Sequence, residues 1–262
     1  MSPTASWTCL PAELQSMIFE ELAQDGCPLA SCAAVCRDWQ AVFEPKTFAR
    51  LTITQKRAAA MNDIVGRHSR RRHVKYILFW IKLPAYGCSR CNLQTDPSWY
   101  KRETAIIKGA LKDFLRALST WQPGGDLLLD ITIHSPSDSK HWFKAHHYGS
   151  DAVPTSDGGG QSLARTHDPH HGWIHGRQGS HPLEAVLRVY KVLIVQTDQL
   201  PKLACKAPAV TRLLFRRQSR IHLYPEFIAP LCERLPNLEE VHCEFWRGRD
   251  RDVLAYTDFC KS

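Results

Sequence analysis

The chain has 262 residues, of which 44% are hydrophobic and 23% are charged, a composition typical of a soluble globular protein. No apolar run approaches the roughly 18 residues that a membrane-spanning helix needs, and the first residues lack a signal-peptide pattern. Ten cysteines without a secretory signal indicate reduced thiols. We therefore expect a cytoplasmic or nuclear protein.

The net charge of +8 is unevenly distributed. Residues 1–50 carry a net charge of −3, so the remainder carries +11. A basic excess of this kind suggests an acidic partner or a nucleic acid, but it informs association and not the fold. The densest basic cluster lies at residues 67–75, and a solvated turn between a helix and a strand explains it better than a nuclear-import signal or a phosphate-binding patch.

The first fifty residues predict three short helices. Pro11 suits the first helical position, and Leu14, Ile18 and Leu22 then recur four apart on one side of a helix. A turn at residues 24–28 separates it from two further apolar patterns, which are carried by Leu29, Cys32, Ala33 and Cys36 and by Trp39, Val42 and Phe43. Three such helices bury little apolar surface, so the unit needs the rest of the chain or a partner to pack against.

Residues 7–51 resemble the F-box, the adaptor module of SCF-type ubiquitin ligases. The resemblance depends on residue types and spacing that agree across all three helices, at Leu10, Pro11, Glu13, Leu14, Ile18, Leu22, Leu29, Ala33, Val35, Cys36 and Trp39. Residues 48–51, 83–88 and 123–131 are also similar to fungal F-box proteins of unassigned substrate. The alternative is a generic helical bundle.

The resemblance implies a partner and a set of contact residues. Six side chains would face or support the Skp-type subunit of the ligase: Leu10, Pro11, Leu14, Ile18, Val35 and Trp39. Some of them must also hold the three helices together, and the sequence does not separate the two roles. We accordingly expect an F-box domain at residues 1–51 and a substrate or partner domain at residues 52–262.

Beyond residue 51 the pattern alternates strands with helices. Four expected strands share a template, with apolar residues at positions one, four and six: Val74/Ile77/Phe79, Leu128/Ile131/Ile133, Val210/Leu213/Phe215 and Leu238/Val241/Cys243. The last two start 28 residues apart, within the range of leucine-rich repeats. An N-cap at Asp96 opens a helix with Ile107, Leu111, Phe114, Leu115 and Leu118 on one side. We therefore predict an α/β fold, in which an irregular leucine-rich-repeat-like array with parallel, adjacent strands follows the F-box; the alternative is a non-repetitive α/β domain.

Residues 134–181 interrupt this pattern. They hold nine of the thirteen histidines, a glycine run at Gly158–Gly160 and few aliphatic residues. Such a composition favours a long loop, and we predict disorder at residues 137–181.

Two groups of residues suggest metal chemistry. Cys88 and Cys91 have zinc-knuckle spacing, but structural zinc needs four ligands and no second C-x-x-C exists. The other ligands would have to come from scattered His or Cys, so we expect two reduced thiols in a loop. The histidines at 167, 170, 171 and 175 lack the carboxylate of an H-E-x-x-H pattern, so they also predict no physiological metal site. We expect no cofactor.

Neither a phosphate-cradling loop, a G-x-S-x-G motif nor a kinase signature set is present, so the sequence favours a non-enzyme. The function that the resemblance implies is a substrate-recognition adaptor. It would dock on the Skp-type subunit of a cullin ligase and hold an unknown protein target through the C-terminal domain. The alternatives are a basic protein associated with nucleic acid or chromatin, which we consider less supported, and an F-box scaffold that delivers nothing for degradation.

Overall fold

The computed structural model describes residues 7–66, 68–93, 95–145, 166–190, 192–193, 205–216, 219, 222–223 and 225–244. Its helices are η1 (Trp7–Cys9), α1 (Ala12–Gln24), α2 (Leu29–Ala33), α3 (Arg37–Phe48), α4 (Gln55–Ala58), α5 (Met61–Val65), α6 (His68–Arg71), η2 (Cys88–Arg90), α7 (Pro97–Leu118), η3 (Asp138–Lys140), η5 (Pro169–His171), α8 (Leu183–Val189) and α9 (Pro225–Cys232). Its strands are β1 (Arg50–Thr54), β2 (Tyr76–Lys82), β3 (Leu127–His134), β4 (Trp173–Ile174), β5 (Arg177–Gln178), β6 (Val192–Leu193), β7 (Val210–Phe215), β8 (His222–Leu223) and β9 (Glu240–Cys243). Among the described helices, none is both long and apolar enough to cross a bilayer.

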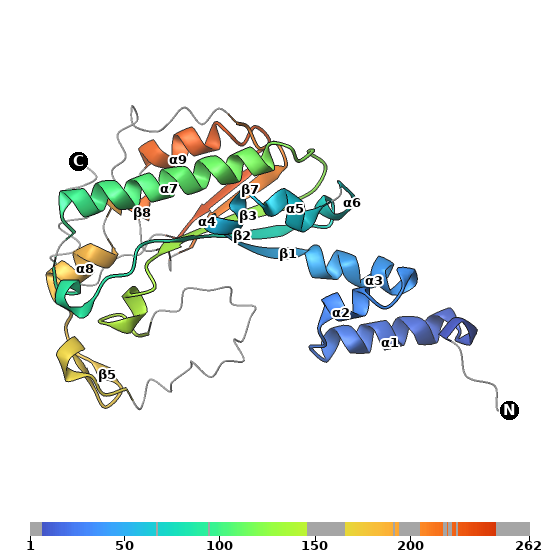
Figure 1. Ribbon diagram of the computed structural model, residues 1–262, viewed down its shortest axis with the longest axis horizontal. Coiled ribbons are helices and arrows are strands. Elements are labelled where there is room, and N and C mark those ends of the chain that lie inside the picture. Colours follow the sequence, from blue (N-terminus) through green and yellow to red (C-terminus); the bar gives the residue numbers. More distant parts are fainter. Residues whose placement is uncertain are drawn as a thin grey trace.

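A five-stranded sheet in the order β1-β2-β3-β7-β9 forms the centre of the protein (Figure 1). Every neighbouring pair is parallel, which confirms the prediction that the four templated strands lie side by side and parallel. The mixed helix and strand architecture that the sequence predicts is therefore present. Parallel strands need long connections, and helices supply several of them here.

The register of the strands argues against a regular repeat. Between β7 and β9 the template positions align, with Leu213 opposite Val241 and Phe215 opposite Cys243. Between β2 and β3 they are offset by two residues, because Phe79 lies opposite Ile131 and not Ile133. An offset of two keeps the apolar residues on the same face, so the template records burial and not a shared repeat unit. The leucine-rich-repeat-like array is not confirmed.

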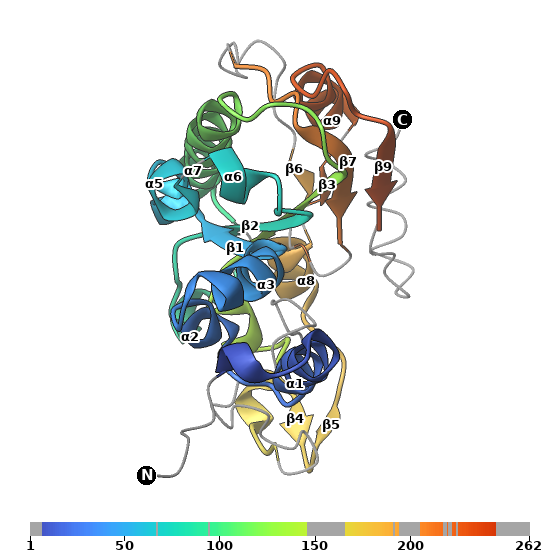
Figure 2. The same ribbon diagram turned by 90° about the vertical axis from the view of Figure 1, so that its right-hand side faces the viewer.

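One face of the sheet carries the main hydrophobic core. The predicted stripe of α7 is buried there, and the Phe114 ring stacks on Phe79 of β2 with 4.0 Å between ring centroids. Residues of α4, α5 and α9 join the same cluster, so these helices share one side of the sheet with α7. Figures 1 and 2 show α7 and α9 on this side. The predicted N-cap is also present, since Asp96 accepts a hydrogen bond from the Trp99 amide at 2.8 Å.

A second, smaller core contradicts the predicted disorder at residues 137–181. Trp142, Phe143 and Trp173 are buried, and the first two pack with α8 in a separate cluster. A two-residue turn with positive φ at His175 and Gly176 joins β4 to β5. The prediction was wrong for residues 137–145 and 166–181, because aromatic side chains replace the missing aliphatic ones. Residues 146–165 lie outside the described residues.

Candidate functional site

An aromatic cluster joins η1, α1 and α3 of the N-terminal module. Trp7, Phe19, Trp39 and Phe43 contact one another, with ring centroids 5.1–5.7 Å apart. The Phe19 ring meets Trp39 and Phe43 edge-on, which is a favourable geometry for aromatic pairs. Phe19 is the buried residue of α1, although the sequence drew attention to the stripe at Leu14, Ile18 and Leu22. Leu14 and Ile18 are exposed outside this small core, whereas Leu22 is half-buried.

The same helices leave large apolar side chains in solvent. Leu14 is 45% exposed, Met17 63% and Ile18 38%, and their spacing of three and four places them on one side of α1. Val35, in the turn after α2, is 62% exposed. An isolated exposed leucine would need no explanation, but three neighbours on one helix side form a surface suited to a partner.

The structure separates the six predicted contact residues into two groups. Pro11, Leu14, Ile18 and Val35 are exposed, and Pro11 sits directly before the first residue of α1. Leu10 and Trp39 are half-buried, and Trp39 belongs to the aromatic cluster. Trp39 therefore supports the helices from inside, whereas the exposed group is free to contact another protein. Met17 was not among the predicted residues, although it lies three residues after Leu14.

The helical module is joined directly to the sheet. Helix α3 ends at Phe48 and edge strand β1 starts at Arg50, so a single residue separates them. The Ala49 carbonyl accepts hydrogen bonds from the amides of Lys75 and Tyr76 at the start of β2. The module thus has the packing support that its size requires.

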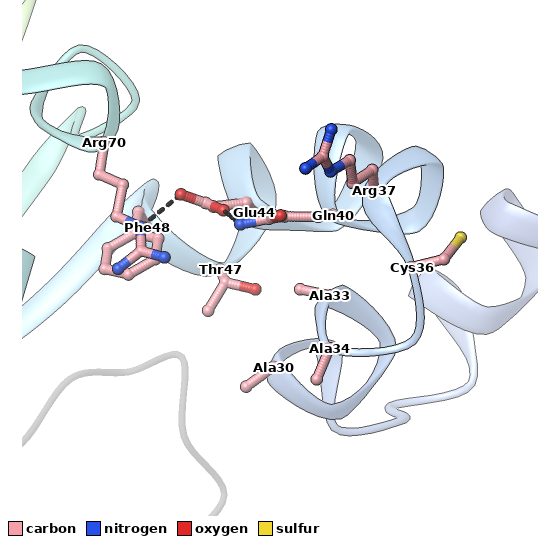
Figure 3. A pocket seen from close by; sticks show the side chains of 10 residues that line it. All are labelled: Ala30, Ala33, Ala34, Cys36, Arg37, Gln40, Glu44, Thr47, Phe48 and Arg70. Carbon is pink, nitrogen blue, oxygen red and sulfur yellow. Dashed lines mark hydrogen bonds and ion pairs between the residues drawn. The ribbon is translucent and has the colours of Figure 1, made fainter. Parts of the chain in front are cut away.

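An ion pair strengthens this junction. Glu44 of α3 bonds Arg70 of α6 at 2.5 Å, and the Arg70 guanidinium lies 5.2 Å from the centre of the Phe48 ring. Burial raises the pKa of Glu44, but hydrogen bonds from Arg70 and Gln40 outweigh it and leave the pKa lowered. These side chains line a hollow of about 520 Å³ between α2, α3 and α6, shown in Figure 3. Ala30, Ala33 and Ala34 of α2 line one wall of the hollow, and polar side chains of α3 and α6 line most of the rest.

Within the basic cluster, residues 68–71 form α6 and residues 72–75 connect it to β2, so the predicted solvated turn is in part a short helix. Besides Arg70, Arg71 is engaged within the protein: its guanidinium donates to the Thr120 carbonyl at 3.1 Å and lies 5.8 Å from the Trp121 ring. Arg70 and Arg71 of this basic cluster therefore stabilise the fold.

A buried charge cluster lies on the face of the sheet opposite the main core. Asp130 of β3 accepts hydrogen bonds from the Tyr76 hydroxyl at 2.6 Å and from Arg216 at 2.7 Å. Burial, followed by the bond to Asp130, raises the pKa of Tyr76 to about 12. Burial also raises the pKa of Asp130, although both hydrogen bonds oppose this. These contacts link β2 and β3 to Arg216, directly after β7, although among the described residues the buried Asp130 Oδ1 atom has no hydrogen-bond partner.

The cysteines and histidines are arranged differently from the prediction. Cys88, Cys91, His141 and His171 each offer one ligand atom, and these atoms all lie within 4.8 Å of one another. A second C-x-x-C is absent, as the sequence shows, but the scattered residues His141 and His171 bring two further ligand atoms beside the cysteine pair. No spacing rule links residues 141 and 171 to the C-x-x-C pair, so the sequence could not reveal the set.

Neighbouring groups affect the protonation of the side chains in and around this cluster. The hydrogen bond from Lys144, which has the largest effect, and the bond from His171 together lower the pKa of Asp168 to about 2 against the effect of burial. Asp168 is therefore a carboxylate that only accepts, so the His171 Nδ1 atom, 2.7 Å away, must carry the proton. Burial raises the pKa of the Cys91 thiol, and the adjacent Cys88 raises it further.

Comparison with known protein families matches residues 7–54 to the F-box-like family. No curated protein and no solved structure matches the chain. An F-box-like domain therefore occupies the three helices and β1, within an α/β chain, and it suggests an adaptor that binds a Skp-type subunit in an SCF-type complex.

Proposed function

We propose that this protein is a substrate-recognition adaptor of an SCF-type cullin ubiquitin ligase. The F-box-like domain docks on the Skp-type subunit, and the domain built on the parallel sheet holds a protein target. The adaptor acts by proximity, since it raises the effective concentration of a target lysine near the ubiquitin-loaded enzyme. On this proposal the protein performs no chemistry itself.

The observation that carries the proposal is the exposed apolar side of α1. The aromatic cluster already stabilises the module, so Leu14, Met17 and Ile18 are not required for its core. Full burial of a leucine or isoleucine is worth roughly 1.5–3 kcal/mol. Truncation of one such side chain at the centre of an interface therefore costs about tenfold to a hundredfold in affinity.

The test is co-purification of the Skp-type subunit with the Pro11→Ala/Leu14→Ala variant, followed by circular dichroism on the same samples. We expect capture to be lost while the circular dichroism spectrum stays unchanged, because both side chains are exposed. The matched control is Ile174→Ala/Val241→Ala, which removes two exposed apolar side chains outside the module and should keep full capture. Undiminished capture by the first variant would defeat the proposal.

Two features weigh against nucleic-acid binding. The acidic N-terminal fifty residues carry a net charge of −3, and two arginines of the densest basic cluster are engaged within the fold. Phosphate binding weakens steeply with added salt, whereas a mostly apolar interface does not. Salt dependence therefore separates the two functions.

The finer predictions accompany this proposal. They are a target-binding region at residues 52–262 that forms an irregular leucine-rich-repeat-like array, a kinship with fungal F-box proteins and a cytoplasmic or nuclear location. A non-degradative scaffold would bind the Skp-type subunit equally well. A target of a degradative adaptor accumulates when the proteasome is inhibited, whereas a target of a non-degradative scaffold does not.

A further inference from the structure

Three distant segments converge on four metal-binding side chains at the end of the sheet opposite the F-box-like domain. Cys88 and Cys91 follow β2, His141 follows β3, and His171 ends η5. In Figure 1 the F-box-like helices lie at one end of the sheet, and α8 with the β4–β5 hairpin lies at the other. Strands β2 and β3 are parallel neighbours, so their carboxyl ends place the two connections side by side.

The separations suit a tetrahedral ion. The His171 Nε2 atom lies 3.3 Å from the Cys88 sulfur and 3.2 Å from the His141 Nδ1 atom. A zinc ion with bonds of about 2.3 Å to sulfur and 2.0–2.1 Å to nitrogen would hold its ligand atoms about 3.3–3.8 Å apart. All four ligand atoms lie within 4.8 Å of one another, so small side-chain adjustments would complete the geometry.

His171 is positioned by a second layer of contacts. Asp168 accepts from His171 Nδ1, which leaves the Nε2 lone pair directed at the cluster. A carboxylate behind a metal-binding histidine is a common arrangement in zinc proteins. The Trp142 ring meets the His171 ring edge-on, and a Cβ on Gly172 would come within 3.0 Å of Trp142. Gly172, whose φ of 71° favours glycine, thus permits the close packing behind His171.

The cysteine pair has the turn that a metal knuckle needs. Residues 88–90 form η2, and the Cys91 amide donates to the Cys88 carbonyl at 3.0 Å. This turn directs both thiols to the same point. Cys91 and His171 are buried, whereas Cys88 is exposed and provides a path for the ion.

We propose that Cys88, Cys91, His141 and His171 bind one structural zinc ion. Mixed thiolate and imidazole ligands in a tetrahedral set select zinc over magnesium or calcium, which prefer oxygen. All four positions are filled by protein, so the site is closed and structural. On binding, the two thiols form bonds to zinc and release their protons to solvent. The ion cross-links the segments after β2 and β3 to η5, and it anchors the second core, in which Cys91 and Trp142 already pack.

The test is the zinc content of untagged full-length protein, produced with added zinc and purified under reducing conditions. We expect one zinc ion per chain in the wild type and essentially none in Cys88→Ser/Cys91→Ser or in His141→Ala/His171→Ala. The matched controls are Cys205→Ser and His170→Ala, which remove a thiol outside the set and the exposed neighbour of His171. Both controls should retain full zinc.

A second measurement tests the proposal on the wild-type protein, in case a double variant fails to fold. Chelator-treated wild-type protein is titrated with cobalt(II), whose visible absorption reports tetrahedral geometry and whose ultraviolet charge-transfer band reports thiolate ligation. We expect both signals to saturate at one equivalent and to disappear on addition of zinc. Absence of zinc from the wild type together with no thiolate band overturns the proposal, as does full zinc in either double variant. Neither outcome bears on the Skp-type subunit.

Discussion

The two small units at opposite ends of the sheet are stabilised in different ways. Each is too small to be stable alone. The F-box-like domain uses an aromatic cluster and the direct passage of α3 into β1, and it keeps the apolar side of α1 in solvent. The unit around Trp142 buries its aromatic residues and brings two cysteines and two histidines together beside them. An exposed apolar side suits a partner, whereas a cluster of Cys and His suits an ion.

The largest expected effect distinguishes a buried side chain of the F-box-like domain from an exposed one. Phe19→Ala removes the buried ring of α1 and should lower the free energy of unfolding of this domain by about 3–5 kcal/mol. Leu14→Ala removes a side chain that is 45% exposed and should change it by only about 0.5 kcal/mol. Hydrogen exchange of residues 12–48 measures both. Equal losses would mean that the exposed side of α1 is part of the core.

The next prediction concerns the histidine support in the other unit. Asp168→Asn retains the shape but replaces the carboxylate that fixes the His171 proton at Nδ1. Loss of such a second-layer contact should weaken zinc affinity by about tenfold to a hundredfold. Competition with a chelator of known affinity measures this change. His167→Ala, close in the chain but outside the ligand set, should leave the affinity unchanged.

The smallest effect is expected at the junction between the F-box-like domain and the sheet. Arg70→Gln removes the partner of Glu44 and should cost about 0.2–1 kcal/mol, because both side chains are partly exposed. The folded-state pKa of Glu44 is lowered, so the contribution of the pair is present above the ordinary glutamate pKa and is lost as pH falls through the lowered value.

Urea denaturation at neutral and acidic pH, compared with the exposed neighbour variant Arg72→Gln, tests this. The difference between the two variants should shrink towards zero at acidic pH. A difference that stays constant or grows on acidification would show that the ion pair does not stabilise the junction.

Local patterns predicted the elements of this fold well. The spacing of Ile107, Leu111 and Phe114 identified the buried side of α7, and the short apolar runs identified β2, β3 and β7. Both predictions succeeded because apolar residues on a buried side recur in the sequence with the period of their helix or strand. The same patterns could not distinguish a shared repeat from shared burial, since an offset of two residues leaves the buried face unchanged.

The sites were harder to predict because they depend on contacts between distant residues. No local pattern shows that Phe19 and Trp39 close the aromatic cluster and leave Leu14 and Ile18 exposed. Likewise, the C-x-x-C pair was visible, but 50 residues separate Cys91 from His141, and only the folded sheet brings them together. The composition of residues 134–181 also misled, because Trp142 and Phe143 form a core with aliphatic residues that α8 supplies from outside that segment.

The most direct test of the adaptor proposal is a calorimetric titration of the full-length protein with a purified Skp-type subunit at low and high salt. We predict saturable binding of one subunit per chain, with a dissociation constant that changes little between the two conditions, because the contact side of α1 is apolar. Leu14→Ala/Ile18→Ala should weaken that binding by at least about tenfold. Absence of saturable binding at low salt, or binding that high salt abolishes, would contradict the proposal.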